Sequence, residues 1–168
     1  MTGFTTLADG RRIAHRFTPG KGPALVFLPG YMSDMAGSKA QAVHDWAGLH
    51  GQACLLLDYS GCGESSGEFK DGTLSRWREE VLALIEVHCP QDGGHPVILI
   101  GSSMGGWLML LVGLVLGERL AGLIGIAAAP DFTEDLIWQQ MEEPARMVLE
   151  TEGVIYETSS YGDDPYAI

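Results

Sequence analysis

Residues 96–116 read PVILIGSSMGGWLMLLVGLVL, and this stretch decides the fold. The run 96–100 is short, apolar and rich in β-branched residues, which predicts a buried strand. The run 107–116 is longer and apolar, which predicts a buried helix. Between them, Gly101 and Gly105 stand two residues on either side of Ser103. A Gly-x-Ser-x-Gly turn between a strand and a helix is the arrangement of a nucleophile elbow, so Ser103 is the candidate nucleophile.

The turn predicts an oxyanion hole as well as a nucleophile. It places the Ser103 hydroxyl at the N-terminus of the following helix, where free N–H groups and the helix dipole favour developing negative charge. We expect the backbone N–H of Met104 to be one oxyanion-hole donor. We expect the N–H of Tyr31 to be the second, because the Pro-Gly pair at 29–30 lets that backbone turn toward the serine. Tyr31 and Met32 are also expected to contact the substrate.

A plainer interpretation of the same residues stays open. Gly101, Ser102 and Ser103 could make a tight strand-to-helix turn in which one serine only caps the helix. In that case the pattern would carry no chemistry.

The order of elements around the elbow predicts the fold class. After a hairpin at residues 5–18, turning at Asp9-Gly10, apolar runs alternate with helical patterns. The expected strands are 23–28, 53–57, 96–100 and 121–128, and the expected helices are 38–50, 73–88 and 107–116. Ser38 can cap the first of these helices and Gly51 ends it, and Thr73 starts the second. Short apolar strands that alternate with helices are typical of an α/β fold, a mostly parallel sheet with helices on both faces. Ligands of such sheets bind at the carboxyl ends of the strands.

Charge divides the 168 residues into two parts. Residues 131–168 carry ten acidic side chains and one basic residue, Arg146, whereas residues 1–130 carry twelve and nine. We therefore expect a core at 1–130 and an acidic lid or cap segment, itself incomplete, at 131–168. The net charge of −12 argues against a nucleic-acid partner, whose phosphates it would repel.

The cysteines bear on the compartment. Cys54, Cys62 and Cys89 are odd in number, lack a C-x-x-C spacing, and follow no secretory signal at residues 1–4. This pattern favours free thiols in a reducing compartment, and we expect a cytoplasmic protein. Glu118 and Arg119 interrupt the apolar stretch 107–129, so neither part reaches the ~20 residues of a membrane span.

No cofactor or metal is expected. Gly61 and Gly63 lack the spacing of a dinucleotide-binding loop, and the next helix begins only at about residue 73. Histidine, cysteine and aspartate do not occur at the spacings of metal ligands.

Three stretches together resemble the α/β-hydrolase family. LPGY at 28–31 matches its oxyanion loop, DYSGCGES at 58–65 matches its D-x-x-G-x-G-x-S loop, and GSSMG at 101–105 matches its elbow. The run FLPGYMSDMAGSKA at 27–40 is similar to the subgroup that contains the mitochondrial acyl-glucuronide esterase and palmitoyl-protein thioesterase. The resemblance covers about residues 4–130, and residue 131 onward resembles the start of the lid.

The resemblance implies a serine hydrolase that cleaves ester or thioester bonds of small molecules or acyl-proteins through an acyl-enzyme on Ser103. The family places a catalytic acid and a histidine after the serine, but every histidine here precedes it: His15, His44, His50, His88 and His95. The triad Asp and His are therefore not present in this chain. We expect a fragment that lacks the C-terminal part of the fold and is weakly active or inactive alone.

Two further expectations follow. The alternative to an enzyme is a non-catalytic α/β-hydrolase-like fragment or binding module. The strand expected at 121–128 would be an unprotected apolar edge, so the fragment is expected to self-associate.

Overall fold

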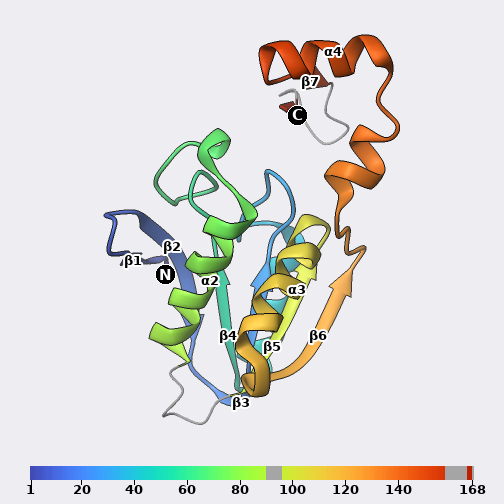
Figure 1. The fold of residues 1–168 in the computed structure, drawn as a ribbon. Helices are drawn as coiled ribbons and strands as arrows, with labels where there is room; N and C mark the ends of the chain where they lie inside the picture. The colour runs from blue at the N-terminus through green and yellow to red at the C-terminus, as the bar shows by residue number, and fades with distance from the viewer. Residues whose placement is uncertain (90–95, 158–165, 168) are drawn as a thin grey trace. The chain divides into compact units, whose positions relative to one another are not determined.

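Four parallel strands form most of a six-stranded sheet in the computed structural model, which describes residues 1–89, 96–157 and 166–167 (Figure 1). The parallel strands are β3 (Lys21–Leu28), β4 (Gln52–Leu57), β5 (Val97–Ser102) and β6 (Leu120–Ile126). The antiparallel hairpin of β1 (Gly3–Thr6) and β2 (Arg12–Thr18) extends the sheet beside β4. The resulting strand order is β1-β2-β4-β3-β5-β6.

Helices cover both faces of this sheet. In Figure 1, α2 (Leu74–His88) and α3 (Met104–Leu116) lie in front of the strands, and α1 (Ser38–His50) lies behind them. The side chains of β4 from Ala53 to Leu57 are buried because this strand lies between the two helical layers. The expected α/β architecture is confirmed.

Strand register brings the carboxyl ends of the parallel strands to one edge. Leu28 of β3 pairs with Gly101 of β5, and Ser102 of β5 pairs with Ile126 of β6. Phe27 of β3 pairs with Leu56 of β4. The loops that follow these strands therefore begin at the same level, next to the first turn of α3.

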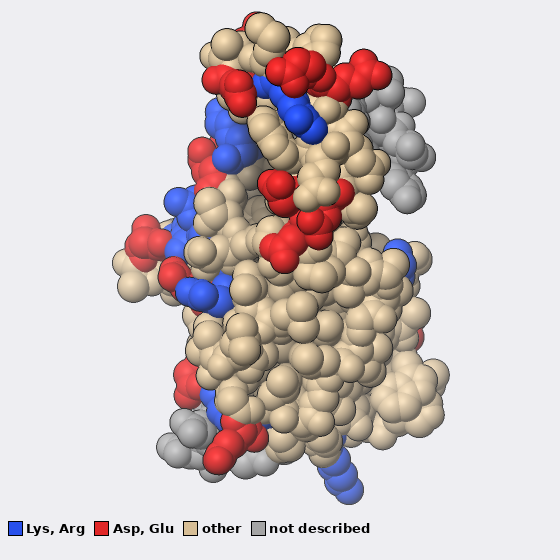
Figure 2. Space-filling model, turned by 45° about the vertical axis from the view of Figure 1, so that its right-hand side comes forward, with Lys and Arg blue, Asp and Glu red and all other residues tan. Residues whose placement is uncertain are grey.

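The sequence overestimated burial at the β6 side of the sheet. Apolar runs predicted a buried helix at 107–116 and a buried strand at 121–128, but several side chains there are exposed: Leu110, Leu114, Val115, Leu123 and Ile124. β6 is the last strand of the sheet, so its outer edge has no strand partner among the described residues. Figure 2 brings this side forward and shows a broad surface without charged side chains over α3 and β6.

Helix ends agree with the sequence at two places and differ at one. Thr73 caps α2, its hydroxyl accepting a hydrogen bond from the Arg76 N–H at 3.1 Å. Gly51 ends α1 in the left-handed conformation, as expected of a C-terminal glycine. Ser38 was expected to cap α1, but the cap residue is Gly37, and no side chain makes a capping hydrogen bond there.

Residues Asp131–Ile168 form a separate unit from Met1–Pro130. Its elements are a π-helix at Thr133–Trp138, α4 at Glu143–Glu152, and a short antiparallel pair of β7 (Tyr156–Glu157) and β8 (Tyr166–Ala167). Within the described parts of both units, no helix has the length and apolar character needed to cross a membrane.

Candidate active site

Ser103 stands alone as an exposed residue in the turn from β5 to α3. Its backbone has φ 52° and ψ −121°, a region that residues with a side chain rarely occupy. Residues 101–102 before it and 104–106 after it are all buried. A strained, exposed serine among buried neighbours is the kind of feature that proteins retain at functional sites.

Two glycines make this turn possible. A Cβ on Gly101 would lie 2.4 Å from the Gly105 carbonyl oxygen, and a Cβ on Gly105 would lie 2.1 Å from the Leu28 carbonyl oxygen. Both distances are far below van der Waals contact, so neither position accepts a side chain. The spacing that identified the elbow therefore reflects a close approach of β3, β5 and α3.

Backbone hydrogen bonds hold the turn in place. The Ser103 N–H donates to the Ile126 carbonyl at 3.0 Å, at the end of β6. The Ser103 carbonyl accepts from the N–H groups of Gly106 and Ala129. The Ser103 side chain makes no capping hydrogen bond to α3, although the residue occupies the cap position. The plainer interpretation of Ser103 as a helix cap is therefore not supported by its geometry.

The loop after β3 lies against the serine. A Cβ built on Gly30 would lie 3.3 Å from the Ser103 Cβ, so Gly30 lies next to Ser103 with little room for a side chain between them. Tyr31 follows immediately, half-buried, with its ring packed edge-on against Phe69 at 4.9 Å. Met104 is the first residue of α3, where N–H groups have no partner within the helix. The structure thus brings both backbone segments expected to form the oxyanion hole next to Ser103.

A small cavity of about 140 Å³ opens beside this loop. It is lined by Met32, Ser33, Asp34, Gly61, Cys62, Gly63 and Phe69. Met32 is exposed and has φ 50°, so the backbone turns sharply where substrate contact was expected. Burial raises the pKa of the Cys62 thiol to about 12, which makes this cysteine a poor nucleophile near neutral pH.

A larger hollow of about 490 Å³ lies at the other end of α3 and is lined by Leu82, Glu86, Val115, Leu116, Glu118 and Arg119. At 1.5 Å per residue, Leu116 at the end of α3 lies about 20 Å from Ser103. This hollow is therefore not part of the candidate active site.

The four described histidines are engaged away from Ser103. His15 on β2 and His88 at the end of α2 pack their rings together, with centroids 4.4 Å apart. His44 hydrogen-bonds Thr18, and His50 stacks on Trp46. His95 lies outside the described residues. No group of three or more His, Cys, Asp or Glu side chains in the described part of the chain could hold a metal ion.

Two buried acids beside the site were given no role by the sequence. Asp58, directly after β4, accepts hydrogen bonds from the N–H groups of Met35 and Glu64, and Glu80 on α2 accepts one from the Ser60 N–H. Burial raises the pKa of Asp58, and the two N–H donors oppose this shift. Glu80 was detectable in principle, because it falls among the apolar positions 77, 81 and 84 of one helix face.

Comparison with known proteins supports the resemblance. The model of the Alpha/beta hydrolase family matches residues 25–165. Palmitoyl-protein thioesterase ABHD10, mitochondrial, from Homo sapiens is 38% identical over 161 residues, which cover 96% of this chain and 51% of that protein. The Mus musculus protein of the same name is 41% identical over 128 residues, covering 76% of this chain and 42% of its own. The chain spans about half the length of the curated relatives it matches.

Two solved structures are also similar to this chain in fold and sequence. A crystal structure of a protein from Agrobacterium vitis S4 has a TM-score of 0.89 at 37% identity and covers all of this chain and 67% of its own. Alpha/beta hydrolase domain-containing protein 10 from mouse has a TM-score of 0.83 at 34% identity, covering 96% of this chain and 62% of its own.

The expected cytoplasmic location is wrong by this comparison, because the matching relatives are named mitochondrial. The three cysteines are free, as expected, and all three are buried. Free thiols are compatible with any reducing compartment, so the cysteines did not identify which compartment it is. With the fold, the elbow and the matched residues in agreement, the chain belongs to the alpha/beta hydrolase family.

Proposed function

We propose that this chain carries the nucleophile and the oxyanion hole of a serine hydrolase that cleaves carboxylic ester or thioester bonds. The observation that carries the proposal is the exposed, strained Ser103, which lies next to Gly30 and at the N-terminus of α3. In the proposed complex, the carbonyl carbon of the substrate lies beside the Ser103 hydroxyl. Its carbonyl oxygen lies beside the backbone N–H groups of Tyr31 and Met104.

The proposed reaction has two steps. The Ser103 Oγ forms a bond to the carbonyl carbon while its proton passes to a base, and the N–H groups of Tyr31 and Met104 stabilise the oxyanion. The C–O or C–S bond then breaks, and the alcohol or thiol leaves with a proton, so that the acyl group stays on Ser103. Water attacks the acyl-enzyme in the second step and releases the acid and the free serine. Loss of one oxyanion donor typically lowers kcat about 10²–10³-fold.

The names of the relatives favour a substrate class. Those relatives are palmitoyl-protein thioesterases by name, so we propose a long-chain acyl thioester, with Tyr31 and Met32 contacting the acyl carbonyl region. The cavity beside Met32 is too small for a whole palmitoyl chain and would take only a part of the substrate. We further propose that residues 131–168 are an incomplete lid or cap segment.

The rate at which Ser103 reacts depends on the base that accepts its hydroxyl proton. Since the described histidines are engaged elsewhere, we expect residues 1–168 to use water as the base and to react slowly. An oxyanion hole alone still accelerates acyl transfer about 10³–10⁴-fold over water.

A fluorophosphonate probe tests the proposal on purified 1–168. Phosphorus bonds to the Ser103 Oγ, fluoride leaves, and water takes the hydroxyl proton. We expect slow labelling that the Ser103→Ala substitution abolishes. The Ser102→Ala variant is the matched control, because Ser102 is the buried neighbour on β5, and it should keep the labelling. Labelling that is absent, or that persists without Ser103, would favour the alternative of a non-catalytic domain.

A further inference from the structure

Asp58 joins the two loops that border the candidate active site. Its side chain is only 1% exposed, and each carboxylate oxygen accepts a backbone hydrogen bond. Oδ1 accepts from the Met35 N–H at 2.7 Å, and Oδ2 accepts from the Glu64 N–H at 2.8 Å. One carboxylate at the end of β4 therefore holds both the loop after β3 and the loop after its own strand.

Tyr59 holds the same β3 loop at its other end. Its side chain is fully buried, and its hydroxyl donates to the Pro29 carbonyl at 3.0 Å. Pro29 precedes Gly30, the residue that lies next to Ser103. Neighbouring side chains thus fix the first and last residues of 29–35, the segment that contains the proposed donor Tyr31.

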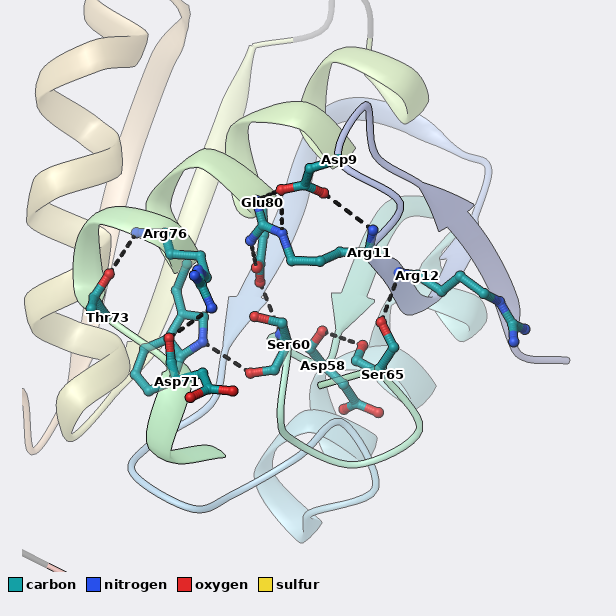
Figure 3. A network of polar contacts seen from close by, with 12 residues as sticks. Asp9, Arg11, Arg12, Asp58, Ser60, Ser65, Asp71, Thr73, Arg76 and Glu80 are labelled. Carbon is teal, nitrogen blue, oxygen red and sulfur yellow. Dashed lines mark hydrogen bonds and ion pairs between the residues drawn. The ribbon is translucent and has the colours of Figure 1, made fainter. Parts of the chain in front are cut away.

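The segment that carries Asp58 and Tyr59 is itself anchored to α2. Glu80 accepts from the Ser60 N–H at 2.9 Å, and the Trp77 indole N–H donates to the Ser60 carbonyl at 3.1 Å. Glu80 is fully buried and pairs with Arg11, which also binds Asp9 (Figure 3). Both backbone groups of Ser60 are therefore held from one face of a helix.

Burying the carboxylates of Asp58 and Glu80 costs free energy, and their hydrogen bonds favour one arrangement of the loops. A buried carboxylate must be fully hydrogen-bonded to be tolerated, and a satisfied buried network favours one geometry over its alternatives. Stability alone would be served as well by apolar side chains of similar size. The presence of two acids and a tyrosine, in place of apolar side chains, therefore indicates that they serve to fix one conformation of the loop they hold.

We infer that Asp58 and Tyr59 are positioning residues that hold the Tyr31 N–H at the distance from Ser103 that acyl transfer needs. This inference rests on the proposed function. Misplacement of a reacting group by about 1 Å can cost about 10²-fold in rate, so even a small shift of the loop is measurable.

The Tyr59→Phe substitution is the sharpest test, because it removes one hydroxyl and keeps the ring. The rate constant of fluorophosphonate labelling at saturation should fall by about 10-fold or more, while the probe concentration at half saturation changes less than about twofold. Asp58→Ala should lower the same rate constant. Amide hydrogen exchange of Met35 should accelerate in Asp58→Ala, since its acceptor is lost.

Thr18→Val is the control for general destabilisation, because it removes the hydrogen bond between Thr18 of β2 and His44 of α1 and leaves residues 29–35 and 58–64 unchanged. It should leave the labelling rate at the wild-type value. Ser103-dependent labelling that proceeds at the wild-type rate in Tyr59→Phe would overturn this inference and leave the proposed function standing. Absence of Ser103-dependent labelling in the wild type would overturn both.

Discussion

At the scale of single residues, the site depends on positions where only one residue type fits. Backbone hydrogen bonds to β6 and α3 hold Ser103 at a positive φ. The strain is tolerated because these surrounding contacts fix the backbone of the turn. Gly101 and Gly105 are required by the close approach of carbonyl oxygens. Such positions can be recognised in a sequence, because their spacing is local.

Gly105→Ala should therefore destabilise the protein by about 3 kcal/mol, since its Cβ would meet the Leu28 carbonyl at 2.1 Å. Urea unfolding followed by circular dichroism measures the change. Gly48→Ala is the control: this exposed glycine of α1 has nothing within 4 Å of the added methyl, so the substitution should stabilise by about 0.5–1 kcal/mol. Equal effects of the two substitutions would contradict the packing described for the elbow.

His88 predicts a pH dependence of stability. Burial lowers its pKa, and the neighbouring His15 lowers it further. The folded protein therefore resists a proton that the unfolded chain accepts near pH 6.5. The free energy of unfolding should fall as the pH drops below about 6.5 and should level off below the folded-state pKa.

Urea unfolding at a series of pH values measures this dependence. The His88→Gln variant cannot take up the proton and should lose less stability than the wild type between about pH 7 and pH 5.5. The same pH dependence in both proteins would show that His88 is not the group responsible.

At the scale of elements, side-chain caps and helix faces can be predicted only in part. Thr73 caps α2 as its sequence context suggests, but Ser38 does not cap α1, because α1 begins one residue earlier than a cap at Ser38 requires. Helix boundaries shift by one residue easily, since neighbouring positions have similar local energies. The local pattern locates a helix more securely than it assigns its cap.

Thr73→Ala should lower the free energy of unfolding by about 1 kcal/mol through loss of the hydrogen bond to the Arg76 N–H. Thr73→Ser keeps the oxygen and should cost much less. Ser38→Ala should change stability by less than about 0.5 kcal/mol, because no capping bond is lost. Thermal and urea unfolding of the three variants would distinguish these outcomes, and a large effect at Ser38 would be the contrary result.

At the scale of the whole molecule, the sheet ends in an uncharged apolar face. β6 has an open edge in the described structure, and Leu114 on α3 is 82% exposed. An exposed strand edge with apolar flanks is a template for pairing with another chain. We expect a second copy of this chain to occupy this face in solution.

Light scattering coupled to size-exclusion chromatography should accordingly show mass that rises with protein concentration. Charged substitutions on the face, Leu114→Glu and Ile124→Lys, should shift the protein toward the monomer. Leu49→Glu is the control, because Leu49 is 86% exposed on α1, behind the sheet. A monomeric wild type at all concentrations would refute the expectation.

Fold and site were predictable from sequence to different degrees. Most strands and helices were correctly placed, because apolar periodicity and turn residues are local signals. The elbow was predictable because a fixed spacing of glycines around a serine implies its geometry. The unprotected edge of the strand at 121–128 was expected, but the exposed side chains of α3 and β6 were not, since a uniformly apolar run gives no sign of which of its sides another element covers.

By itself, the amino-acid sequence determined the types of elements, their order, and the strained turn at Ser103. Only the tertiary structure decided that Asp58, Tyr59 and Glu80 hold the loops near that serine. The physical reason is that turn geometry depends on neighbouring residues. In contrast, hydrogen bonds across 20 to 30 residues depend on strand order and register, which no local pattern encodes.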